Sequence, residues 1–155
     1  MILDAPDIPG AASVKAWFGY WPAFHDAEVL SICLDRSIGC RVAVHAFTTT
    51  RDTDASGHFV LDKHAIVTFV LEGFPQDSLG IVNTNLAGFN HQNVLSGLTV
   101  NKNGEWYELV LDGIYGVDGV ISATQIWVEI APGAPPDSPA NSNTPAMKTS
   151  NSDLS

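Results

Sequence analysis

Apolar and polar residues alternate along most of this chain, and this period of two predicts β-strands rather than helices. Gly, Pro, Asn and Asp, the residues that tight turns favour, separate the alternating stretches. About seven short strands at regular spacing predict a mainly β fold, an antiparallel β-sandwich or curled sheet with a short N-terminal helix. The predicted strands are Glu28–Asp35, Arg41–Thr50, His58–Leu61 with Ala65–Glu72, Val94–Asn101, Glu105–Leu111, Ile114–Val117 and Val120–Ile130.

The alternation also predicts which side chains the strands bury. In the first strand it places Leu30, Ile32 and Leu34 on the buried face. His45 stands within an apolar strand, so we expect a partly buried histidine with a hydrogen-bond partner rather than a metal ligand. The last stretch, Val120–Ile130, alternates without interruption and is interpreted as one strand.

Turn signals locate two hairpins and limit the helix content. Asn103–Gly104 is the strongest short hairpin signal in the chain, and Gly39 suits a second turn between the first two strands. Only Ser13–Phe18 has a helical beginning, with its first residue as a candidate N-cap. Pro22 prevents that helix from extending beyond Trp21.

The C-terminal part of the chain has a different composition. Five prolines fall within residues 131–145, with few bulky apolar residues among them. Such a segment buries too little apolar surface to offset the entropy lost on ordering. We therefore expect residues 1–131 to form a single mainly β domain and residues 132–155 to be a disordered tail.

Charge narrows the possible partners. Seventeen acidic residues against seven basic ones give a formal net charge of −10, which repels nucleic-acid phosphates and anionic membranes. The same charge attracts a cationic protein, although solubility is the commoner reason for it. The first residues lack the pattern of a secretory signal, and no apolar run approaches the length of a membrane span. We expect a cytoplasmic protein whose oligomeric state the sequence leaves open.

The segment Trp17–Val29 places five aromatic residues just before a His, an Asp and a Glu. Crowded aromatics form either part of a core or a recognition surface. Residues two apart on a strand share a face, so Asp26 and Glu28 are expected together, opposite His25. Paired carboxylates can bind a divalent cation. We favour the simpler interpretation, in which Asp26 caps a turn and Glu28 is a charged strand edge.

Other patterns that could carry chemistry are weak. Asp52–Gly57 reproduces the first half of a calcium-binding loop, but Lys63 stands where the loop needs a bidentate carboxylate. We interpret this stretch as a polar hairpin tip. The histidines lack the spacing of a zinc site, and no nucleophile motif is present in the sequence. We therefore expect no catalytic residue, no metal and no cofactor.

Four consecutive polar side chains lie between apolar anchors in Phe89–Leu95. In the interior they would satisfy loop backbone groups, and at the surface they would contact the polar edge of a partner. We favour the structural role. These residues are Asn90, His91, Gln92 and Asn93.

Phe18–Val29, together with Gly88–Leu95 and Tyr115–Gly119, resembles the immunity-protein-50 family of bacterial polymorphic toxin systems. The resemblance covers about residues 16–130, and its first motif is the most distinctive. It implies a small cytosolic protein that binds and neutralises a cognate toxin, a cationic one if the charge is complementary. The resemblance implies no catalytic residues for this chain.

The leading hypothesis is thus a non-enzymatic immunity protein. Its aromatic residues Trp17, Tyr20 and Trp21 are interface anchors if they are exposed, and part of the core if they are buried. The alternative is a small metal-dependent hydrolase in which His25, Asp26, Glu28 and His91 converge on one cleft. A third is a structural subunit of a homo-oligomer with a large apolar interface. The candidate partner-binding residues are Trp17, Tyr20, Trp21, His25, Asp26, Glu28, Asn90, His91, Gln92 and Asn93.

Overall fold

The computed structural model describes residues 3–75 and 81–136, with side chains from residue 84 onward in the second range. Eight antiparallel strands form one open sheet in the order β4-β7-β6-β5-β1-β2-β3-β8. This confirms the predicted mainly β, curled-sheet class. The strands are β1 Glu28–Asp35, β2 Gly39–Thr53, β3 Phe59–Glu72, β4 Ile81–Asn85, β5 Val94–Asn103, β6 Trp106–Tyr115, β7 Asp118–Ala123 and β8 Gln125–Pro132.

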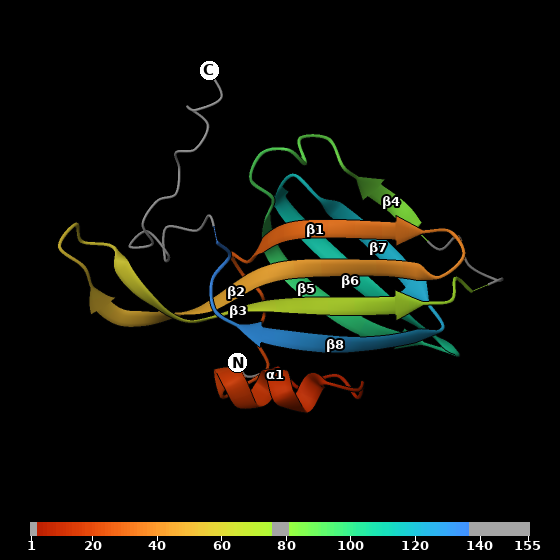
Figure 1. Ribbon diagram of the computed structural model, residues 1–155, viewed down its shortest axis with the longest axis horizontal. Helices are drawn as coiled ribbons and strands as arrows, with labels where there is room; N and C mark the ends of the chain where they lie inside the picture. The colour runs from red at the N-terminus through yellow and green to blue at the C-terminus, as the bar shows by residue number, and fades with distance from the viewer. Residues whose placement is uncertain (1–2, 76–80, 137–155) are drawn as a thin grey trace, which may run out of the picture.

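The sheet curls over itself into two layers. In Figure 1, β1, β2, β3 and β8 lie in front, while β5, β6 and β7 cross behind them. The layers are joined narrowly, because β1 pairs with β5 only where Glu28 lies opposite Val94. Facing apolar side chains fill the space between the layers, so each strand buries one face. The largest fully buried ones include Val42, Val44, Phe69 and Leu71 in the front layer and Leu109, Leu111 and Ile121 in the back layer.

The single helix of the described residues, α1 (Ala11–Phe18), packs beside β8 (Figure 1). The prediction of a helix here is confirmed, but Ser13 is not its N-cap. The cap is Gly10, whose φ of 90° is left-handed, and no side chain bonds to the helix terminus. A Cβ at Gly10 would collide with the Val128 carbonyl, while the Val128 N–H donates to Pro9 at 3.0 Å. The chain therefore enters the helix in contact with the edge strand.

The burial predicted for the first strand is wrong in part. Its bounds are as predicted, but the pairing register with β2 shifts between Val29 and Ser31, which leaves Leu30 as an extra residue. One extra residue reverses the alternation. Val29, before the bulge, is therefore buried, whereas Ile32, after it, packs against the core as predicted. Leu34, near the end of the strand, is 51% exposed, contrary to the expectation. Cys33, which lies between Ile32 and Leu34 and alternates with them, is exposed, as the alternation predicts.

The predicted strand Val120–Ile130 is two strands. The chain breaks at Thr124, where the backbone N–H donates to Gly73 and the hydroxyl to Glu72. β7 lies between β4 and β6, whereas β8 forms the opposite edge of the sheet. The chain thus crosses from the back layer to the front layer within one residue, and no break in alternation indicates it.

Both predicted hairpins are confirmed: β1 pairs with β2, and β5 with β6. The second turn is Gly104–Glu105, one residue later than the Asn-Gly signal. β4 was not predicted as a strand, and the predicted strand Ile114–Val117 is the end of β6 and the turn after it. Of the predicted tail, residues 137–155 lie outside the described residues, and β8 continues to Pro132.

β2 and β3 continue beyond the layers as a two-stranded hairpin, which we call the arm (residues 48–62), extending to the left in Figure 1. Ala46 pairs with Ala65, but Thr48 pairs with Asp62, so β3 has one residue more than β2 at this point. The bulge contains Lys63, whose φ is 53°. Such a bulge bends a ribbon, which explains why the arm leaves the sheet here.

Candidate functional site

The aromatic segment before β1 is mainly core. Trp21 is 5% exposed and packs edge to face with Phe24 and Phe69, at ring-centroid distances of 5.7 and 6.5 Å. Trp17 is half-buried, and its indole N–H donates to the Lys63 carbonyl at 3.0 Å. Of the three aromatic anchor candidates, only Tyr20 is well exposed, at 42%.

His25 and Asp26 form a pair, contrary to the prediction that they face opposite ways. The strand begins only at Glu28, and the preceding residues form a turn in which Phe24 and Asp26 have φ of 61° and 67°. This turn brings His25 Nδ1 to 3.2 Å from Asp26 Oδ2. Both side chains are more than half exposed, so the pair contributes little to stability.

Asn93 lies where three segments meet, Phe18–Val29, Gly88–Leu95 and Tyr115–Gly119. It is 4% exposed, and its amide nitrogen lies 2.9 Å from the Phe89 carbonyl, 3.3 Å from that of His91 and 3.5 Å from that of Val29. A Cβ at Gly116 would collide with Asn93 Oδ1, and this oxygen accepts no hydrogen bond within the described residues. The segments therefore meet around one buried amide that holds loops together, while Asn90, His91 and Gln92 are exposed.

Support for a metal-dependent hydrolase is slight. Within residues 3–75 and 81–136, no three His, Cys, Asp or Glu side chains gather closely enough to hold a metal ion. Among the hydrolase candidates, His25 and Asp26 are in contact, at 3.2 Å. Asp54, in the predicted calcium-like stretch, accepts the backbone N–H groups of His58 and Ser56, as a turn cap does. These bonds lower the pKa of the Asp54 carboxyl.

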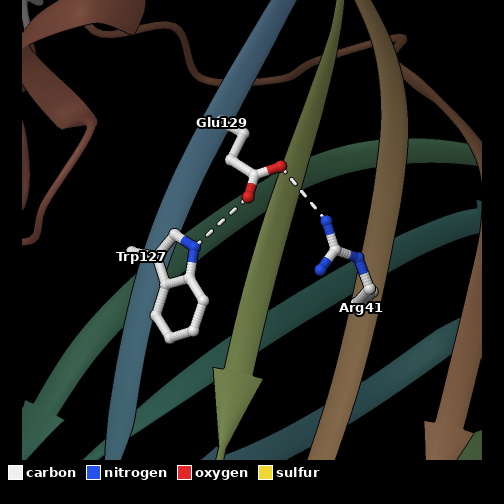
Figure 2. Close-up of polar contacts among 3 residues, drawn as sticks. All are labelled: Arg41, Trp127 and Glu129. Carbon is white, nitrogen blue, oxygen red and sulfur yellow. Dashed lines mark hydrogen bonds and ion pairs between the residues drawn. The ribbon is translucent and has the colours of Figure 1, made fainter.

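A different set of side chains gathers on the outer face of the front layer. Arg41 in β2 and Trp127 in β8 both pair with Val70 of β3, so the two project to the same side. Glu129 lies between them: Arg41 Nη2 is 3.1 Å from Glu129 Oε2, and the Trp127 indole N–H donates to Glu129 Oε1 at 3.3 Å. In Figure 2, the bond from the Glu129 carboxylate to Arg41 passes over β3. We call Arg41, Trp127 and Glu129 the clasp.

A hollow of about 270 Å³ adjoins the clasp and shares Arg41 with it. Ile38 and Glu72 also line this hollow. So does Cys40, where burial raises the pKa of the thiol to about 11 and keeps it protonated. The surface beside the clasp is therefore concave, and its Cys40 thiol is not an activated nucleophile.

His45 is buried and hydrogen-bonded, as predicted. Its Nε2 lies 2.9 Å from His64 Nδ1, so one ring nitrogen donates and the other accepts. Phe47 contacts both rings, at centroid distances of 5.6 and 5.9 Å. Burial, and then the neighbouring His64, lower the pKa of His45. This histidine pair lies at the base of the arm.

The clasp was missed from the sequence because Arg41 and Glu129 are 88 positions apart and meet only through the strand order. No helix in the described part of the chain is long and apolar enough to span a membrane. Comparisons with protein-family models, curated proteins and solved structures found no match to the chain. A function for this protein must therefore be inferred from its own residues.

Proposed function

We propose that the protein is a non-enzymatic binding protein that occludes a protein partner. The partner class is the one that the immunity-protein-50 resemblance implies, a bacterial toxin that this protein neutralises. The observation that carries the proposal is the clasp, an Arg and a Trp held by one carboxylate on an exposed sheet face.

The clasp suits recognition better than it suits stability. Arg41 and Glu129 are 53% and 52% exposed, and an exposed ion pair contributes only about 0–1 kcal/mol to folding. Trp and Arg, in contrast, are among the residues that most often dominate interface energetics. Because Glu129 already orients both side chains, a partner would immobilise them at a smaller entropic cost.

The charge of the chain indicates the kind of partner. A formal charge of −10 attracts a cationic protein and accelerates its association, an effect that salt screens. A toxin with a basic surface would benefit from both the long-range attraction and the clasp. We therefore expect tight binding that weakens as ionic strength rises.

Co-expression tests the proposal. The reading frames adjacent to the gene would be screened for a toxin domain, and growth measured when it is expressed with and without this protein. Wild-type protein should restore growth. If no adjacent toxin domain exists, or if wild-type protein fails to restore growth, the proposed function is overturned.

The clasp needs its own comparison within that assay. Trp127→Ala and Arg41→Ala should reduce rescue, since each removes one clasp side chain. Tyr115→Ala is the matched control, because Tyr115 is 65% exposed but lies in β6 of the back layer. Equal rescue by the Trp127 and Tyr115 variants would show that the clasp is not the recognition site.

A further inference from the structure

The arm exposes three consecutive apolar side chains. Phe59, Val60 and Leu61 are 59%, 39% and 40% exposed, and consecutive strand residues point to opposite faces. Each face of the arm therefore carries at least one exposed apolar side chain near its tip. All residues from Arg51 to Lys63 are exposed, so no described part of the body covers this end of the arm.

Folding alone does not account for such an element. A two-stranded hairpin separate from a core is marginally stable in water. Exposed apolar residues on strands also invite aggregation, and natural proteins usually replace them with charges. Clustered exposed apolar side chains more often mark an interaction site.

The base of the arm is fixed before any partner binds. Trp17 donates its indole N–H to the Lys63 carbonyl, and Lys63 Nζ donates to the Trp17 carbonyl at 3.1 Å. The same ammonium group lies 5.8 Å from the centre of the Trp17 ring. His45 and His64 add a hydrogen bond across the two strands. Helix α1 thus holds the bend, and a preorganised arm loses less entropy on binding.

The charges on the arm indicate what kind of surface binds it. The arm contains three carboxylates, those of Asp52, Asp54 and Asp62, against one guanidinium, that of Arg51. A complementary surface has an apolar floor and a basic rim. A second copy of this chain is disfavoured, because two chains of charge −10 repel one another.

We infer that the arm is the inhibitory element and inserts Phe59, Val60 and Leu61 into an apolar, basic-rimmed cleft of the toxin. This inference rests on the proposed function. It adds which surface of this protein binds the toxin and what kind of cleft on the toxin receives it. Arg41 and Thr48 are seven residues apart on β2, roughly 23 Å at 3.3 Å per residue. One partner can therefore touch both the clasp and the base of the arm, since a standard interface of about 800 Å² per partner is roughly 30 Å across.

The test is calorimetric titration of the toxin domain encoded by the adjacent reading frame into purified full-length variants. Phe59→Ser combined with Leu61→Ser should raise Kd by about 100-fold or more, as loss of hot-spot residues does. Leu86→Ser is the matched control, because Leu86 is 46% exposed and lies outside the arm, and its Kd should stay within about threefold of wild type. Thermal unfolding of each variant verifies that it is folded.

The outcomes separate the two proposals. If wild-type protein binds and the arm variant binds equally well, the arm inference is wrong and the proposed function stands. If wild-type protein does not bind, the proposed function fails. A wild-type dimer that the arm substitutions dissociate, with unchanged affinity for the toxin domain, would instead assign the arm to self-association and overturn the inference.

Discussion

Replacing Trp21 with Ala should destabilise the protein far more than replacing its neighbour Tyr20. Trp21 is 5% exposed and contacts the Phe24 and Phe69 rings, whereas Tyr20 is 42% exposed. Removing a buried Trp side chain costs about 3–5 kcal/mol of folding free energy, because the favourable transfer of its apolar surface out of water is lost and a cavity remains. Tyr20→Ala should cost about 0.5 kcal/mol or less.

Thermal and urea unfolding measure the difference. For a chain of this size, 1 kcal/mol shifts the midpoint by about 2–4 °C, so Trp21→Ala should lower Tm by roughly 6–20 °C. Tyr20→Ala should lower it by about 2 °C at most. Equal shifts for the two variants would refute the assignment of Trp21 to the core, and would restore it as a candidate interface anchor.

Three further predictions concern the loops, the histidine pair and the base of the arm. Gly116→Ala should destabilise the protein by about 1–3 kcal/mol in urea unfolding, because φ is 82° and the new Cβ would collide with Asn93; a wild-type midpoint would contradict this. The pKa of His45 is lowered from 6.5, so the unfolded chain takes up a proton first as pH falls. Stability should therefore be complete above about pH 6.5 and decrease below it, and His45→Gln should flatten this slope between about pH 7 and 5; an unchanged slope would show that another group titrates. Trp17→Phe removes the indole N–H that bonds to Lys63 and should cost about 0.5–1.5 kcal/mol, whereas unaltered stability would exclude that bond as a support of the arm.

The period-two alternation was enough to predict most of the strands, but neither β4 nor the positions where the strands break. The bounds of β1 followed from it, and the Asn103–Gly104 turn signal predicted the hairpin after β5. The bulge at Leu30 and the break at Thr124 followed from neither, because both occur within uninterrupted alternation and depend on pairing with other strands. A bulge residue inside a strand cannot be recognised from the sequence pattern when the residues around it are equally apolar.

The candidate site was harder to predict for the same reason. Alternation in β8 places Trp127 and Glu129 on one face, but Arg41 joins them only because β3 lies between β2 and β8. Whether Trp21 is core or surface likewise depends on Phe69, 48 positions along the chain, which packs against it. Local patterns report which residues share a face, and the strand order decides which faces meet.

Amide hydrogen exchange tests the central claim most directly, with the protein alone and then saturated with the toxin domain from the adjacent reading frame. The account predicts slower exchange on binding in the arm, residues 48–62, and around Arg41 and Trp127, with the exposed loop Asn90–Gln92 unchanged. Protection confined to that loop, or no protection anywhere, would contradict it.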